Sequence, residues 1–252
     1  MKPYQQIPIV ECYEPLLPLP LAQFAVEDPH PYVQLAAPYG GKSPYFLRQG
    51  VLEALLQAQA WLQQVYPNWR IQIFDAYRPI AVQQYMVDYT FAETVRNKGL
   101  VLEQLTDAQR QTIWAQVYQF WAVPSADPKM PPPHSTGAAI DVSLVDASGT
   151  VVNMGSPIDE MSPRSHPNFF AQDFAQETGR SGEEDLRLEP VSESDRATFH
   201  AHRQILTYAM TTAGFQQHPG EWWHFSLGDQ LWAWLKNQQT PGLEQIARYG
   251  AI

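Results

Sequence analysis

Cysteine is nearly absent from this sequence of 252 residues, in which Cys12 is the single example. One thiol cannot form an intrachain disulfide, so the fold must be held together by packing and hydrogen bonds. The absence of disulfides favours a reducing compartment, although secreted proteins without disulfides also exist.

Long apolar runs are also missing. No stretch reaches the ~18 apolar residues that a membrane-spanning helix needs. Within the first 30 residues, proline and glutamate interrupt each apolar run before the core of a signal peptide could form. We therefore expect a cytoplasmic protein that does not insert into a membrane.

Basic residues are scarce: 16 Lys and Arg stand against 26 Asp and Glu, which gives a formal net charge of −10. A surface of this sign repels phosphate backbones and anionic lipids, so binding to nucleic acid or to a membrane surface is disfavoured. Hydrophobic residues make up 44% of the chain, which is enough for a sizeable core. The 22 prolines predict long ordered loops rather than a helical bundle.

Periodicity and capping signals predict both helices and strands. Helices are expected at 50–66, from 79 through 86, at 107–121, from 194 to about 212, and at 229–236. Strands are expected at 70–74, 139–145, 150–154 and 221–227. Residues 1–50 read as a wrapping segment with short strands, and 155–195 read as irregular.

This mixture predicts the α+β class, as a single domain whose small antiparallel sheet is flanked by helices. Residues 1–30 are expected to form an N-terminal arm ahead of a domain at 31–252. We find no internal repeat, and the length suits one domain better than two.

Two of the seven histidines lie in unusual settings. His134 and Asp141 flank a turn of small residues at Gly137, and His224 follows Glu221 by three positions. Imidazole and carboxylate ligands suit Zn²⁺, which binds them at roughly 2.0–2.2 Å. On a helix, seven residues would separate the two backbones by roughly 10.5 Å. A loop that turns at Gly137 and enters a strand can bring them together, so the spacing predicts a loop-to-strand metal site.

Each of these residues also has an ordinary explanation when it is considered alone. A histidine before a Gly-Ala turn is usually a surface or hydrogen-bonding residue, and an aspartate at the start of a strand, such as Asp141, is usually a turn former. Glu221 and His224 could form a charged turn beside an aromatic strand. Only their combination favours a metal site.

The combined pattern is His134-x-x-Gly137-x-Ala139-x-Asp141 and, far downstream, Glu221-x-Trp223-His224. It resembles the zinc D-Ala-D-Ala peptidases, a group that includes VanX-type D-alanyl-D-alanine dipeptidases, VanY-type carboxypeptidases and, more distantly, hedgehog signalling domains. The resemblance covers roughly residues 30–235 and implies a zinc D-Ala-D-Ala dipeptidase-like domain at 31–252.

Three further segments resemble the dipeptidase branch in particular: Asp75-Ala76-Tyr77-Arg78-Pro79, Met154-Gly155-Ser156-Pro157-Ile158-Asp159 and Arg164-Ser165-His166. The first corresponds to the strand end that carries an arginine, and the second to the segment that binds the substrate amine. One departure is Pro132, because the family commonly has serine two residues before its first metal histidine.

The resemblance implies one zinc ion per chain in the sheet. The metal ligands would be His134, Asp141 and His224. Three protein ligands leave a fourth position for water, as in catalytic rather than structural sites. Glu221 would be the base that takes a proton from this water and passes it to the leaving amine.

The resemblance also implies roles for two residues outside the metal site. Arg78 would stabilise the oxyanion that forms at the peptide carbonyl; the alternative explanation, without the family match, is a surface salt bridge at a strand end. Asp159 would anchor the substrate ammonium, or else be a turn residue after Pro157. Among the other histidines, His166, His200, His202 and His218 read as residues that support the site or lie at the surface.

The resulting hypothesis is zinc-dependent hydrolysis of the free D-alanyl-D-alanine dipeptide to D-alanine, in the turnover or recycling of cell-wall material. The partner would be this small molecule, with no nucleic acid and no membrane, and the oligomeric state stays open. One alternative is a zinc D,D- or L,D-carboxypeptidase that acts on longer peptidoglycan peptides. A second is a non-catalytic, zinc-stabilised binding domain, but such a domain would have no need for Glu221 and Arg78.

Overall fold

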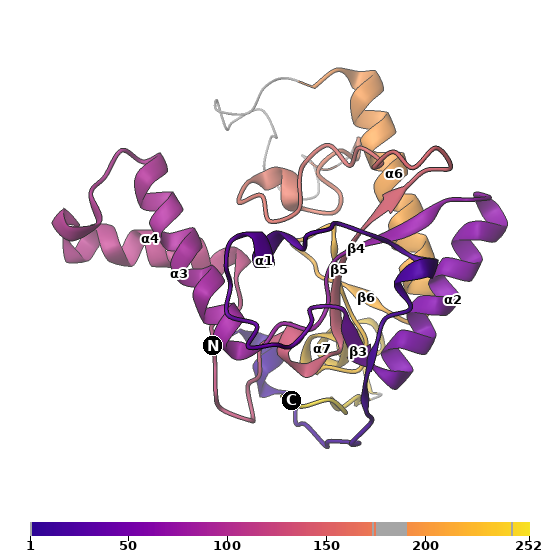
Figure 1. The fold of residues 1–252 in the computed structure, drawn as a ribbon, viewed down its shortest axis with the longest axis horizontal. Coiled ribbons are helices and arrows are strands. Elements are labelled where there is room, and N and C mark those ends of the chain that lie inside the picture. The colour runs from indigo at the N-terminus through magenta and orange to yellow at the C-terminus, as the bar shows by residue number, and fades with distance from the viewer. Residues whose placement is uncertain (1, 173, 175–190, 243) are drawn as a thin grey trace.

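The structure is a computed structural model that describes residues 2–172, 174, 191–242 and 244–252. It belongs to the α+β class, as the sequence predicts. In Figure 1 the sheet lies between α2 and α6 on one side and the projecting pair α3 and α4 on the other. None of the helices in the described ranges is both long and apolar enough to cross a membrane.

The α-helices are α1 (Pro31–Gln34), α2 (Gln49–Val65), α3 (Ile80–Asn97), α4 (Asp107–Phe120), α6 (Glu193–Thr212) and α7 (Gln230–Gln239). The strands are β1 (Leu16–Pro18), β2 (Ala25–Val26), β3 (Phe46–Arg48), β4 (Arg70–Asp75), β5 (Ala139–Val145), β6 (Gln216–Gln217) and β7 (His224–Ser226). Short 3-10 helices are η1 (Pro3–Gln6), η2 (Leu21–Gln23), η3 (Leu102–Gln104), η4 (Pro133–Thr136) and η5 (Pro163–Ser165).

The helices predicted from the sequence are confirmed, with small shifts at their ends. The helix predicted at 50–66 is α2, and the one predicted from residue 79 extends as far as Asn97. Thr106 caps α4 by accepting a hydrogen bond from the backbone N–H of Gln109, a local signal that the sequence shows. The irregular segment predicted at 155–195 contains η5, and residues 173 and 175–190 of it lie outside the described residues.

The main sheet has the strand order β2-β4-β5-β7-β6. The pairs β4–β5, β5–β7 and β6–β7 are antiparallel, whereas β2 runs parallel to β4. The sheet is therefore mixed at one edge and antiparallel around the predicted metal ligands. A second, two-stranded sheet joins β1 and β3.

Strand β5 is the centre of the molecule, and all seven of its residues are buried. Successive side chains of a strand point to opposite faces. Ile140, Val142 and Leu144 join the main hydrophobic core, which also contains residues of α2 and α6. Asp141 and Ser143 therefore face the other way, so one buried face of the sheet carries polar groups.

The strand predicted at 150–154 is wrong beyond a single bridge, between Val145 and Val151. The N–H of Val152 still bonds to the carbonyl of Leu144 at 2.9 Å. At Val142, however, the partner is the carbonyl of Trp223, at 3.0 Å. The segment that leads into β7 therefore takes this edge of β5, and no room is left for a longer hairpin.

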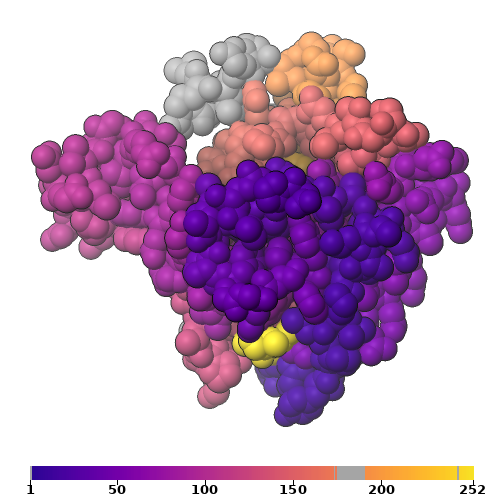
Figure 2. Space-filling view, viewed as in Figure 1, coloured from indigo at the N-terminus to yellow at the C-terminus, as the bar shows by residue number. Residues whose placement is uncertain are grey.

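The first residues of the chain pack against its last third. Helix η1 contacts α7, and the side-chain amide of Gln230 donates to the carbonyl of Ile7 at 2.7 Å. Ile9 forms a parallel bridge with Ala247. Figure 2 shows the C-terminal atoms, in yellow, beside atoms of the N-terminal part, in indigo. The division of the chain at residue 30 stays a prediction.

Candidate metal centre and active site

Three elements bring His134, Asp141 and His224 to one point. His134 lies in η4, which ends at Gly137 with a left-handed backbone (φ 70°), so the chain can turn directly into β5. Asp141 in β5 pairs directly with His224 in β7. Opposed residues of an antiparallel pair have neighbouring side chains, and this register therefore places the two groups together.

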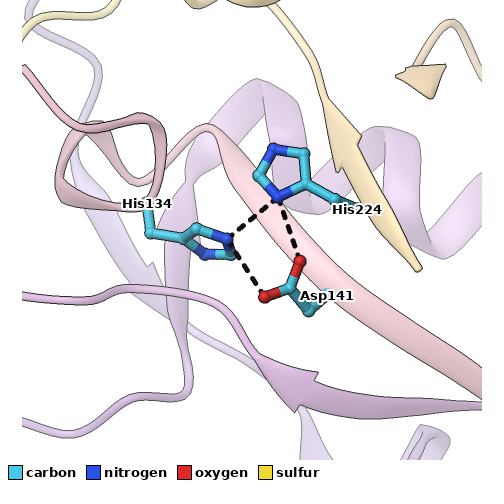
Figure 3. Close-up of side chains that lie close together, drawn as sticks. All are labelled: His134, Asp141 and His224. Carbon is cyan, nitrogen blue, oxygen red and sulfur yellow. Dashed lines mark hydrogen bonds and ion pairs between the residues drawn. The ribbon is translucent and has the colours of Figure 1, made fainter. Parts of the chain in front are cut away.

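The ligand atoms of this trio form a tight triangle (Figure 3). Nε2 of His134 lies 3.2 Å from both Nδ1 of His224 and Oδ2 of Asp141, and that Nδ1 lies 3.0 Å from Oδ1 of Asp141. A tetrahedral ion with bonds of roughly 2.0–2.1 Å would hold its ligands roughly 3.3 Å apart. The three residues therefore fit a single small metal ion.

Outer hydrogen bonds orient both imidazoles for metal binding. Nδ1 of His134 lies 2.8 Å from the carbonyl of Ala76, so it carries the proton and leaves a lone pair on Nε2. Nε2 of His224 faces the hydroxyl of Ser226 at 3.4 Å, and this hydroxyl donates to Asp229 at 2.9 Å. Lone pairs of both rings and a carboxylate thus converge, and a cation satisfies all three.

Glu221 lies in the loop before β7, and its carboxylate is buried beside the trio. Oε2 lies 3.8 Å from Nδ1 of His224, and Oε1 lies 3.7 Å from Nδ1 of His218. Burial raises the pKa of Glu221 to about 7, against the opposing charge of His224 and with a further contribution from Asp141. A carboxyl group with this pKa can both accept and return a proton near neutral pH.

Arg78 follows the end of β4 and lies buried beside the trio. Its guanidinium donates to Asp75 at 2.7 Å, to Gln83 at 2.9 Å and to Asp141 at 3.3 Å. It also lies over the ring of Trp121, 5.0 Å from the centroid. These contacts fix a permanent positive charge next to the candidate metal ligands.

Asp159 reaches the same pocket from the loop after β5. The Tyr32 hydroxyl donates to its Oδ2 at 2.7 Å. Arg203 of α6 holds the loop in place by donating to the carbonyl of Met154 at 2.8 Å and to the hydroxyl of Ser156 at 3.1 Å. The pocket therefore has an acidic end at Asp159 whose position is set by distant elements.

Several residues of the site escape the sequence analysis. Lys2 and Tyr4, which line the pocket, and Tyr32, which binds Asp159, come from segments without motifs, and no local signal marks them. His218, expected to support the site or lie at the surface, lines the pocket, and its N–H bonds to the carbonyl of His224 at 2.9 Å. Trp223, which the sequence motif contains without a role, also lines the pocket.

Two imidazoles and one carboxylate around a single point, with a buried carboxyl group beside them, are the kind of donor set with which single-metal hydrolases bind their ion. The family model described as D-ala-D-ala dipeptidase (peptidase family M15) matches residues 25–244. The chain therefore belongs to this family of metallopeptidases, which confirms the resemblance seen in the sequence motifs.

Two curated relatives agree with this assignment. The chain is 50% identical to a D-alanyl-D-alanine dipeptidase of a Synechocystis species over 255 aligned positions, which cover all of this chain and 97% of the relative. It is 32% identical to the D-alanyl-D-alanine dipeptidase of Escherichia coli K12 over 94 residues, or 37% of each chain. The alignment with the first relative covers the whole chain, including residues 1–30.

Proposed function

We propose that this protein hydrolyses free D-alanyl-D-alanine to D-alanine with one zinc ion held by His134, Asp141 and His224. The observation that carries the proposal is the buried triangle of metal-binding atoms with the Glu221 carboxylate within 4 Å of it. The full-length similarity to a D-alanyl-D-alanine dipeptidase supports the substrate.

A bound zinc ion supplies positive charge to the reacting carbonyl and lowers the pKa of the attacking water. Glu221 takes the proton of that water and returns it to the leaving nitrogen. Arg78, fixed by Asp75 and Gln83, stabilises the negative charge that develops on the carbonyl oxygen. Asp159 receives the substrate ammonium, since Tyr32 binds only one of its two oxygens.

The test is release of D-alanine from D-Ala-D-Ala by purified protein before and after treatment with a chelator. We expect release that the chelator abolishes and that zinc restores at one ion per chain. Parallel assays with other divalent ions identify the preferred metal, because imidazole and carboxylate ligands accept several. L-Ala-L-Ala and a longer peptide ending in D-Ala-D-Ala report stereochemistry and substrate length.

Glu221→Gln separates the role of the base from binding of the metal. We expect turnover to fall by about 10²–10⁴-fold while one metal ion stays bound. Glu103→Gln, at an exposed glutamate, is the matched control and should keep full activity. Cleavage of the longer peptide alone would indicate a carboxypeptidase. A metal-loaded protein that cleaves neither substrate would be a binding domain.

A further inference from the structure

The N-terminal segment places the side chain of Lys2 at the pocket of the proposed active site. Lys2 and Tyr4 both line the pocket that contains Glu221 and His224. The backbone N–H of Lys2 donates to the side chain of Gln5 at 2.8 Å, and Tyr4 is 6% exposed. Because η1 packs against α7, these two side chains are held by a fixed element rather than by a loose end.

Lys2 is half-buried, and its ammonium group has no partner among the described residues. Within the described residues it forms no ion pair or hydrogen bond, and the Tyr4 hydroxyl likewise has no hydrogen-bond partner there. Burial lowers the pKa of Lys2, while the charge of Glu221 opposes this effect. A partly desolvated cation without a partner is favourable only where an anion can reach it.

The second positively charged side chain of the pocket, Arg78, already has hydrogen-bond and ion-pair partners. The guanidinium of Arg78 is shared between Asp75, Asp141, Gln83 and the hydroxyl of Tyr32. A second substrate anion would have to compete with these buried contacts. Lys2 is therefore the cation that a substrate carboxylate can approach without breaking an existing ion pair.

The direction of the substrate places its carboxylate near Lys2. This step rests on the proposed function, in which Asp159 holds the amine and Glu221 protonates the leaving nitrogen. That nitrogen belongs to the residue with the free carboxylate, so this end of the dipeptide lies on the Glu221 side. Lys2 lines the same pocket as Glu221 and His218 and is close enough for its charge to act on both.

We propose that Lys2, together with the hydroxyl of Tyr4, binds the C-terminal carboxylate of the dipeptide. Lys2 would then exclude peptides extended at the C-terminus, because these have no carboxylate at this position, whereas extension at the N-terminus would be limited by Asp159. Asp159 and Lys2 would thus recognise the two charged ends of the substrate.

The test compares D-Ala-D-Ala with its C-terminal amide in the metal-loaded protein. The wild-type protein should prefer the free acid. We expect Lys2→Met to raise KM for the acid about 10- to 100-fold with little change in kcat, and to reduce the preference over the amide by a similar factor. Lys2→Arg should keep both values within about threefold, and Lys98→Met, at an exposed lysine, should change neither.

The outcomes separate this inference from the function on which it rests. No D-alanine release by the wild-type protein overturns both. An active wild-type protein whose KM and acid preference survive Lys2→Met overturns only the role of Lys2. Circular dichroism melting and metal content must match the wild type in each variant. Tyr4→Phe, which preserves packing, should raise KM in the same direction by a smaller factor.

Discussion

Asp159 has a backbone conformation that few non-glycine residues adopt, with φ at 64°. Left-handed geometry costs a residue with a side chain roughly 1 kcal/mol or more, and it persists where the surroundings over-determine it. Here the hydrogen bond from Tyr32 and the loop contacts of Arg203 supply that constraint. These contacts therefore hold the Asp159 backbone in its left-handed conformation, in which the side chain reaches the pocket.

The proposed contact between Asp159 and the substrate ammonium predicts that substrate binding depends on pH. Burial raises the pKa of its carboxyl group to about 6, with a contribution from Asp141 and against the opposing charge of Arg78. Only the deprotonated form pairs with an ammonium, so KM for D-Ala-D-Ala should rise as the pH falls through about 6. Steady-state kinetics between pH 5 and 8 measures this effect.

The variant Asp159→Asn checks the assignment of that pH dependence. It should raise KM at every pH and remove the rise below pH 6, while Asp127→Asn, at an exposed aspartate, should leave the profile of the wild type. An Asp159→Asn protein with the KM and pH profile of the wild type would show that another group holds the amine.

At the scale of elements, three adjacent strands supply the polar face of the site. Asp75 of β4 pairs with Asp141 of β5, which in turn pairs with His224 of β7. An irregularity of the β4–β5 register between Ile73 and Asp75 adjusts this alignment. A slip of one residue would turn these side chains to the other face of the sheet, so the site depends on the register.

Gly137 links η4 to β5 and lies under close packing. Its φ is 70°, and an added Cβ would lie 2.6 Å from Cδ1 of Leu16 and 3.2 Å from Cδ1 of Ile252. We expect Gly137→Ala to lower the free energy of unfolding by about 2–4 kcal/mol, from backbone strain and overpacking together. Urea unfolding measures the loss, and metal titration should show weaker binding because His134 moves.

Gly99 provides the matched control, because its φ is 66° and an added Cβ would meet no atom within 4 Å. Gly99→Ala should cost only the backbone strain, about 1 kcal/mol. Equal losses in the two variants would mean that packing around Gly137 is not restrictive.

The sequence predicts most elements here, because α2, α4 and β5 have clear periodicity or capping signals. The prediction fails at 150–154. The turn at Asp146 forms there, but the strand expected after it is reduced to a single bridge at Val151. The N–H of Asp146 bonds to the carbonyl of Thr150 at 2.9 Å, as in the predicted hairpin. Which segment occupies the remaining edge of β5 is decided by Trp223, more than 70 residues away, and no local pattern contains that information.

At the scale of the whole molecule, metal binding should stabilise the fold. The converging lone pairs of His134, Asp141 and His224 exist only in the folded state, so an ion that binds them favours folding. At a free ion concentration 1,000-fold above Kd the gain is about 4 kcal/mol, or a rise in Tm of about 8–16 °C. Thermal melting with chelator and with zinc measures this shift.

The rise in Tm caused by zinc should depend on the candidate metal ligands. His224→Ala should melt at the same temperature with and without zinc, whereas His202→Ala should retain the shift of the wild type. A stabilisation that persists in His224→Ala would locate the bound ion elsewhere.

The sequence motifs identify the candidate metal ligands, the base and the arginine, because these residue types have restrictive chemistry and spacing. Lys2, Tyr4 and Tyr32 lie in a proline-rich segment whose path over the molecule depends on packing against α7 and on the aromatic cluster around α1 and α3. Tertiary packing brings these side chains to the site, and a single sequence has no local pattern that predicts such packing.

The pocket is lined by residues from Lys2 to Leu231, almost the full length of the chain. Contacts between residues so far apart in the sequence form late in folding, because closing the long loops between them costs conformational entropy. No partly synthesised chain can therefore contain a working site before β7 pairs with β5. In refolding experiments, recovery of turnover should coincide with the slowest global phase rather than with the early formation of helices.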